Sequence, residues 1–240
     1  METFVITGAA GGIGRETVKA LASTERHIVC VDISDDALEP LRQVTVGLAG
    51  EFSFAVNRLD DVAACRNLVE NAGGPVSGLV HLAGVFEADP QTIDDMSIYD
   101  RAIQHNLTNG YMVANAVMEK AAKGGSGAMV FTSSLAFRRG SREHVPYAAA
   151  KGGLVGMARA MSRRYAPNWR VNAVAPGLIN TGMPAKLIAE RGLDRVTREI
   201  PMKRLGEPSE IAAVIAFLMG SAASYITGQC INVDGGIINS

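Results

Sequence analysis

Tyr147 and Lys151 are four residues apart in the sequence, with three alanines between them, and Ser134 lies thirteen residues before the tyrosine. On a helix, a spacing of four places the phenol and the ammonium group on one face. A tyrosine with an ordinary pKa near ~10 is a poor base at neutral pH, but an adjacent cation stabilises the phenolate. The pair therefore indicates a proton-transfer site. The alternative is a tyrosine and a lysine on an ordinary solvated helix face.

The N-terminal segment has the pattern of a phosphate-binding loop. A strand-like run at residues 4–7 is followed by four glycines between positions 8 and 14, and a helix-like run continues from Arg15 to Leu21. Backbone N–H groups at a helix start bind phosphate, and glycines leave room for its approach. The spacing Gly-x-x-x-Gly-x-Gly is not that of the commonest dinucleotide fingerprint. By itself, the loop predicts only an anion site for a pyrophosphate.

Asp32 ends the second strand-like run, Ile28 to Val31. A carboxylate at this point of such a unit accepts hydrogen bonds from the adenosine ribose hydroxyls and repels a 2′-phosphate, which favours NAD over NADP. The alternative is a helix cap or a turn residue. Arg15 and Arg58 could admit a 2′-phosphate, but Asp32 opposes it and Gly11 supplies no basic side chain.

Motifs in a fixed order resemble those of the short-chain dehydrogenase/reductase family over nearly the whole chain. They are the glycine segment Thr7–Gly14, Asn106, Ser134, Tyr147, Lys151, the segment Pro176–Thr181 and the terminal Asp234–Gly236. The resemblance implies an oxidoreductase that moves hydride between a nicotinamide and a secondary alcohol or ketone. The final region, from Arg204 to Gly236, looks most like the 3-oxoacyl-carrier-protein reductases of the family. Those enzymes usually take NADPH and a basic residue in the glycine loop, which conflicts with Asp32 and Gly11.

The resemblance assigns roles to four catalytic residues. Tyr147 passes a proton to or from the substrate oxygen, Lys151 lowers the pKa of the tyrosine and holds the nicotinamide ribose, and Ser134 hydrogen-bonds the substrate oxygen. Two hydroxyl residues directly before Ser134 are rivals for its role, and the thirteen-residue gap favours Ser134. Asn106 anchors a water that links Lys151 to solvent, or caps a helix instead.

The cofactor contacts are inferred in the same way. They are Gly8, Gly11, Gly12, Ile13, Gly14, Asp32, Asn57, Arg58, Ala83, Gly84, Tyr147, Lys151, Pro176, Gly177, Ile179 and Thr181. The chain departs from the family pattern after two strands, the third and the fourth. Asn57 replaces an aspartate that meets the adenine amine, although its amide oxygen can accept the same hydrogen bond. His81 and Leu82 replace two asparagines, which removes an amide that braces the sheet.

Strand-like and helix-like runs alternate along residues 1–240, and we expect one α/β domain of the Rossmann type. The alternation predicts a doubly wound parallel sheet of about seven strands with helices on both faces. Strands are expected near 4–7, 28–32, 52–56, 78–82, 128–132, 170–175 and 230–233. Right-handed crossovers bring the carboxyl ends of parallel strands together, and ligands bind there. The motifs fall at these ends.

Composition excludes several classes of function. A net charge of -1 gives no electrostatic reason to bind nucleic acid or an anionic membrane. No apolar run could span a bilayer and no signal-peptide pattern opens the chain, so we expect a cytoplasmic protein. Three widely spaced cysteines predict reduced core thiols, and four scattered histidines predict no metal site.

The substrate is the least determined feature. Residues 182–205 lie where the family carries a variable lid, and Met183, Leu187 and Met202 suggest an apolar lining. Arg138, Arg139 and Arg142 either hold an acidic or acyl-carrier substrate or form a solvated loop surface. We therefore predict an alcohol or ketone substrate of unknown identity.

Two other classes of function stay open, a regulator that binds NAD without turnover and a structural oligomer subunit. Apolar faces on the helices that contain Asn106 and Tyr147 resemble the interface helices of the family, which implies a homotetramer in either case.

Overall fold

The computed structural model describes the chain except for residues 90–91, 93, 123, 183–188, 190–191 and 239–240. Seven strands form a single sheet in which all neighbouring pairs are parallel, in the order β3-β2-β1-β4-β5-β6-β7. The strands are β1 (Glu2–Thr7), β2 (Arg26–Asp32), β3 (Glu51–Val56), β4 (Val76–His81), β5 (Gly127–Thr132), β6 (Trp169–Pro176) and β7 (Cys230–Val233). The predicted seven-stranded parallel sheet is confirmed.

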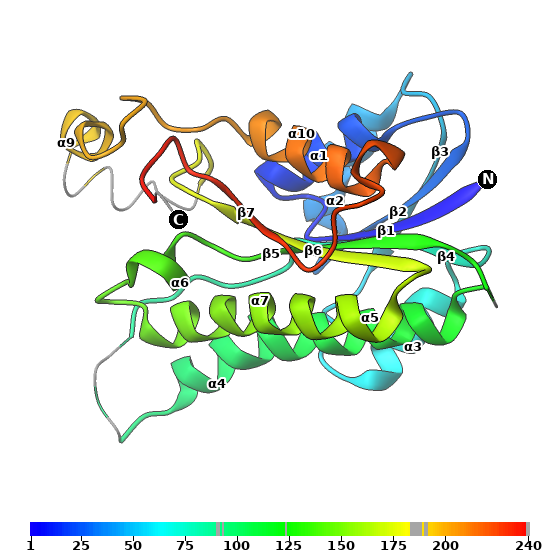
Figure 1. Cartoon of the computed structure of the whole chain (residues 1–240), viewed down its shortest axis with the longest axis horizontal. Coiled ribbons are helices and arrows are strands. Elements are labelled where there is room, and N and C mark those ends of the chain that lie inside the picture. Colours follow the sequence, from blue (N-terminus) through cyan, green and yellow to red (C-terminus); the bar gives the residue numbers. More distant parts are fainter. Residues whose placement is uncertain (90–91, 93, 123, 183–188, 190–191, 239–240) are drawn as a thin grey trace.

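Helices cover both faces of the sheet (Figure 1). The α-helices are α1 (Gly12–Leu21), α2 (Asp35–Thr45), α3 (Val62–Glu70), α4 (Ser97–Ile103), α5 (Asn109–Lys120), α6 (Ala136–Arg139), α7 (Val145–Tyr165), α9 (Leu193–Arg198) and α10 (Pro208–Met219). A π-helical turn, Gln104–Thr108, joins α4 to α5. The short helices α6 and α9 were not predicted, because four to six residues carry too little periodicity to detect.

The core has two layers, one on each face of the sheet. Along β1, Val5 packs into the layer formed with α3, α5 and α7, whereas Phe4 and Ile6 pack into the layer formed with α1 and α10. This alternation follows from the two-residue period of a strand. Both sets are apolar because a parallel sheet is buried on both faces. At ~1.5–3 kcal/mol for each large apolar side chain, these layers are the main source of stability.

Helix α7 is held against the π-helical turn between α4 and α5 by a close approach at Gly153. A Cβ at this position would lie 2.8 Å from a methyl carbon of Leu107. Glycine lowers helix propensity by about 1 kcal/mol relative to alanine, but here it lets two helices meet. Pro146 in the first turn of α7 suits a helix start, because its missing N–H would have had no partner there. The helix start places Tyr147 and Lys151 one turn apart.

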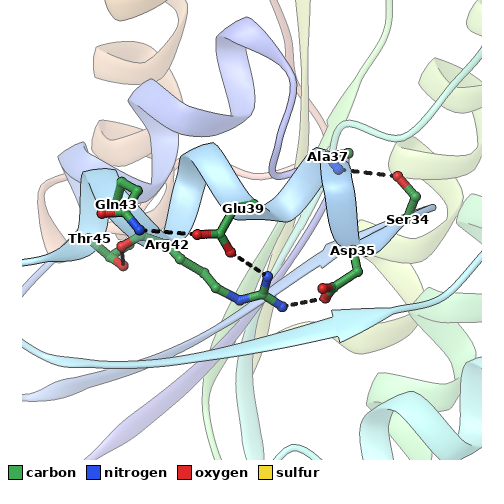
Figure 2. A network of polar contacts seen from close by, with 7 residues as sticks. All are labelled: Ser34, Asp35, Ala37, Glu39, Arg42, Gln43 and Thr45. Atoms are coloured by element: carbon green, nitrogen blue, oxygen red, sulfur yellow. Dashed lines mark hydrogen bonds and ion pairs between the residues drawn. The ribbon is translucent and has the colours of Figure 1, made fainter.

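Helix α2 follows Asp32 directly and is fixed by a polar network (Figure 2). The Ser34 hydroxyl caps it by accepting the N–H of Ala37 at 3.2 Å. The Arg42 guanidinium donates to the carboxylates of Asp35 and Glu39. The bond from Arg42 lowers the pKa of Asp35, and hydrogen bonds from Gln43 and Arg42 together lower the pKa of Glu39. The arginine of this helix is therefore engaged by acids of its own helix.

Candidate active site

A cavity of about 1070 Å³ lies at the carboxyl ends of the central strands. Every residue that we predicted to act in catalysis or to hold the cofactor lines this cavity. They come from segments as far apart as Gly8 and Thr181, so the fold gathers them as the parallel topology requires. Their placement together is a structural fact, and their roles remain predictions.

The glycine loop has no room for side chains. A Cβ at Gly14 would lie 2.2 Å from the carbonyl oxygen of Gly8. Gly8 has a φ of +68°, and a Cβ there would lie 2.8 Å from the backbone nitrogen of Ala83. No side chain caps the start of α1 at Gly11, and its first turn contains no acidic residue. The first N–H groups of α1 therefore remain available to an anion, which fits a dinucleotide pyrophosphate.

Asp32 is oriented by the loop that it follows. Its carboxylate accepts the N–H of Ala10 at 2.9 Å and the N–H of Ile33 at 2.8 Å. It therefore connects the end of β2 to the glycine loop while lining the cavity. Such a carboxylate can still accept hydrogen bonds from ribose hydroxyls, because each oxygen has more than one acceptor site.

Asn57 and Arg58 line the cavity but are already bonded within their loop. The Asn57 amide oxygen accepts the N–H of Leu59 at 2.8 Å, and its NH₂ donates to the carbonyl of Ala64 at 3.0 Å. Arg58 pairs with Asp60 at 3.1 Å. The oxygen of Asn57 keeps one further acceptor position, so the predicted contact with an adenine amine stays possible.

Tyr147, Lys151 and Ser134 meet at the ends of β5 and α7. The Lys151 ammonium lies 5.6 Å from the centre of the Tyr147 ring and donates to the carbonyl of Thr132 at 2.9 Å. Both side chains are buried, at 6% exposed for Tyr147 and 4% for Lys151. Burial lowers the pKa of Lys151 from 10.5 to about 8. Removing an ammonium group from water disfavours its charged form.

The pKa of Tyr147 differs from our expectation. Burial raises it above the ordinary value, and a hydrogen bond with Ser134 opposes this shift. We expected the nearby lysine to lower this pKa. The sequence showed the charge but not the depth of burial, and loss of solvent disfavours a phenolate more than the neighbouring groups favour it here. Ser133 and Ser134 both line the cavity, but the rival Ser133 hydroxyl already donates to the backbone carbonyl of Lys151 at 2.7 Å, whereas the Ser134 hydroxyl is hydrogen-bonded to the phenol.

Asn106 lies within the π-helical turn and does not cap a helix. Its amide accepts the N–H of Val85 at 3.1 Å and donates to the Val85 carbonyl at 3.0 Å. A Cβ at Gly84 would lie 2.4 Å from the Asn106 side-chain oxygen and 3.2 Å from the Lys151 nitrogen. Asn106 therefore fixes the strand end that lies next to Lys151. π-Helical turns occur often at functional sites.

His81 replaces the missing family amide as a structural brace. Its Nδ1 is 2.8 Å from the Thr7 hydroxyl, which joins β4 to β1. The side chain is 1% exposed, and burial, with a smaller effect of the Lys151 charge, lowers its pKa to about 3. It is not among the cavity-lining residues.

The three arginines of the predicted cluster separate in the structure. Arg139 lines the cavity and pairs with Glu199 at 2.9 Å, and Arg142 lines the cavity as an exposed side chain. Arg138 is packed on the Phe137 ring and does not line the cavity. The cluster is therefore not one anion-binding surface.

Phe86 and His144 line the cavity beside Tyr147 and were missed by the sequence analysis. Phe86 follows the small residues of the β4 end, with no motif to mark it. Of the predicted lid, Met183 and Leu187 lie outside the described residues, and Met202 is 61% exposed. Within the lid, Val196 of α9 lines the cavity.

Among the residues that the structure describes, no group of three or more histidine, cysteine or acidic side chains could hold a metal ion. None of the helices described has both the length and the apolar composition needed to cross a bilayer.

Comparison with known proteins gives consistent matches. A family model described as enoyl-(acyl carrier protein) reductase matches residues 8–238. The 3-oxoacyl-[acyl-carrier-protein] reductase FabG of Thermotoga maritima is 34% identical over 98% of this chain and 96% of its own length. An uncharacterised short-chain type dehydrogenase/reductase of Sinorhizobium fredii is 38% identical over 97% of this chain, which spans 43% of that longer protein.

A solved structure has the same architecture. The glucose/ribitol-type short-chain dehydrogenase/reductase from Brucella melitensis superposes with a TM-score of 0.89. It is 34% identical to this chain and the match covers 100% of this chain and 97% of that one.

Proposed function

The chain belongs to the short-chain dehydrogenase/reductase family, and we propose that it is an NAD-dependent oxidoreductase that interconverts a secondary alcohol and a ketone. The observation that carries this proposal is the convergence of Ser134, Tyr147 and Lys151 on the cavity that also contains the glycine loop. A cavity with a dinucleotide cradle at one end and a buried proton donor at the other suits hydride transfer coupled to proton transfer.

The choice of NAD rests on the charges around Asp32. The residues that follow it, Ile33 and Ser34, are not basic. Arg42, the cation of α2, is bonded to Asp35 and Glu39. A 2′-phosphate would thus meet carboxylates with no uncommitted cation on this helix, whereas ribose hydroxyls would find an acceptor in Asp32.

In the proposed mechanism, the bound nicotinamide supplies or takes up the hydride, and the chain moves the proton. Tyr147 would donate its phenolic proton to the ketone oxygen during reduction, or accept the alcohol proton during oxidation. Ser134, already hydrogen-bonded to the phenol, would donate to the same oxygen as charge develops on it. Lys151 would stabilise the phenolate through its positive charge.

Burial affects this arrangement in two ways. It disfavours the charged forms of both side chains, but once the phenolate forms, its attraction to the ammonium group is less screened than at a surface. A raised tyrosine pKa favours the protonated phenol that reduction requires. The carbonyl of Thr132 and the fixed loop at Gly84 hold the ammonium group in place.

A second candidate function is a 3-oxoacyl-carrier-protein reductase. It is supported by the similarity to the Thermotoga FabG protein. It is opposed by Asp32 and by the pairing of Arg139 with Glu199, which leaves little net positive charge for an acidic carrier protein. A regulator that binds NAD without turnover is a third reading, and the assembled catalytic residues argue against it.

The test is a panel of secondary alcohols and ketones with NAD or NADP, followed at the reduced-nicotinamide absorbance. We expect turnover with NAD and a loss of kcat of ~100- to 10,000-fold in Tyr147→Phe. Cofactor affinity, measured by fluorescence titration, should be little changed in this variant, since the phenyl ring is retained. Unchanged turnover in Tyr147→Phe would refute the proposed acid/base role.

We also propose that the protein forms a cytoplasmic homotetramer through the outer faces of α4, α5 and α7. Tyr99, Tyr111 and Val145 on these helices are 44%, 51% and 58% exposed, respectively. Exposed apolar groups of this size favour an interface. Light scattering after gel filtration measures the mass directly, and a monomer mass at micromolar concentration would contradict the proposal.

A further inference from the structure

The loop that follows β4 is hydrogen-bonded to neighbouring elements, and its Phe86 ring lines the cavity. Three alternate residues are each bonded to a neighbouring element: Val85 to the Asn106 amide, Glu87 to Arg101 and Asp89 to the carbonyl of Glu143. These bonds are between 2.7 and 3.2 Å long. Phe86 thus lies in a loop whose backbone is held at Val85 and at Asp89, with an ion pair of the Glu87 side chain between them.

The Phe86 ring is also positioned by its neighbours. It stacks on His144 with ring centres 3.9 Å apart and planes 10° apart. It meets Tyr147 edge to face, with centres 4.9 Å apart and planes at 80°. These are favourable arrangements for aromatic pairs. Phe86 remains 39% exposed and lines the cavity, so part of an apolar ring faces the space next to the proposed proton donor.

The lining of the cavity that contains this ring is partly apolar and partly charged. Its apolar side chains include Val85, Ala88, Leu135, Leu178 and Val196. The Ser141 hydroxyl lies 3.1 Å from the His144 ring nitrogen, so these two polar groups already have each other as partners. Two arginines and two glutamates on this side, at positions 139, 142, 143 and 199, have formal charges that cancel.

We propose that Phe86 is a specificity-determining residue and that the substrate is a secondary alcohol or ketone with an aromatic or similar flat apolar group next to the reacting carbon. This inference rests on the proposed function. The ring of such a substrate would pack against Phe86 while its oxygen faces Tyr147 and Ser134. A polyol would place hydroxyl groups against the Phe86 ring, which cannot bond them, and this disfavours its binding at that position.

The experiment compares three alcohols with NAD: 1-phenylethanol, 2-propanol, which lacks the ring, and ribitol. The variants are Phe86→Ala, Phe86→Leu and the control Phe217→Ala, whose phenylalanine on α10 is 42% exposed and outside the cavity. Wild type should prefer 1-phenylethanol to 2-propanol in kcat/KM. Phe86→Ala should lower kcat/KM for 1-phenylethanol by ~10- to 100-fold and change that for 2-propanol less than ~3-fold. Phe217→Ala should leave the ratio of kcat/KM for 1-phenylethanol to kcat/KM for 2-propanol unchanged.

The outcomes separate this inference from the proposed function. Oxidation of 2-propanol or ribitol in preference to 1-phenylethanol, or an unchanged ratio in Phe86→Ala, overturns the role of Phe86 but leaves an oxidoreductase. Absence of turnover with every substrate and either cofactor removes the proposed function. Saturation-transfer NMR on the ring protons of 1-phenylethanol then still tests whether this ring packs against Phe86, because the saturation-transfer signal should be weaker with Phe86→Ala than with wild type. Phe86→Leu, which keeps apolar volume, serves if the alanine variant does not fold.

Discussion

Lys151→Met should make the cofactor-free protein more stable at neutral pH while it removes most of the activity. The wild-type lysine is 4% exposed, and its pKa falls from 10.5 to about 8 on folding. The folded state therefore binds this proton less tightly than the unfolded chain. At ~1.4 kcal/mol per pH unit, burying the charged amine destabilises the fold by about 3 kcal/mol at pH 7.

Methionine of similar length removes this penalty but leaves the Thr132 carbonyl without the lysine donor. An unsatisfied buried acceptor costs ~1–3 kcal/mol. The net gain at pH 7 is thus about 0–2 kcal/mol, which corresponds to an increase of up to ~8 °C in melting temperature at ~2–4 °C per kcal/mol.

The pH dependence gives the sharper test. The penalty is fully present below about pH 8, fades as the pH rises toward 10.5 and is absent above it. Urea denaturation of wild type and Lys151→Met between pH 7 and 10 should therefore show the advantage of the variant shrinking and then reversing. The exposed Lys120, changed to methionine, is the control and should give a difference that does not vary with pH. The reasoning would be refuted if Lys151→Met were less stable than wild type at pH 7. It would also be refuted if the difference in free energy of unfolding between the two proteins stayed constant from pH 7 to pH 10.

Three further predictions follow from the same geometry. Asp32→Asn should weaken NAD binding by ~10-fold and strengthen NADP binding, because the repulsive charge is removed while an amide oxygen remains. If fluorescence titrations show the same ratio of NAD to NADP affinity as in wild type, the role given to this carboxylate is contradicted. Gly14→Ala should abolish cofactor binding and destabilise the protein by several kcal/mol, since its Cβ would lie 2.2 Å from a carbonyl oxygen. The control is Gly74→Ala, whose Cβ would meet nothing closer than 3.6 Å. In thermal melts, this control should have a melting temperature close to that of wild type. Burial lowers the pKa of His81 from 6.5 to about 3, so wild type should lose stability as the pH falls below 6.5, at up to ~1.4 kcal/mol per pH unit. In acid denaturation, His81→Asn should lose stability less steeply with falling pH. Equal slopes of stability against pH for the two proteins would count against a buried neutral imidazole.

The parallel sheet and the approximate positions of its strands could be predicted because they depend on local patterns. Strand β7, for example, covers Cys230–Val233, as the sequence indicated. Each apolar run is long enough to be recognised, and right-handed crossovers leave few topologies for alternating strands and helices. The helices α6 and α9 were missed because their position depends on contacts such as the pairing of Arg139 with Glu199 rather than on a local period.

The motif residues were also predictable as a group. Gly14 and Tyr147 are far apart in the sequence, but both lie where a strand or its following loop ends, and such ends meet at one edge of a parallel sheet. The residues that select a substrate had no such marker. Phe86 became visible only when its loop, α7 and His144 were placed together.

Spacing along the chain thus determined that a phenol and an amine share a helix face, that a glycine turn precedes a helix and that Asp32 ends a strand. Tertiary structure alone decided how these groups behave. It buried Tyr147 so that its pKa rises, neutralised Arg139 with Glu199 and turned His81 into a brace. The physical reason is that spacing is a local property of the backbone, whereas the solvation and partners of a side chain are set by segments that reach it from elsewhere in the chain.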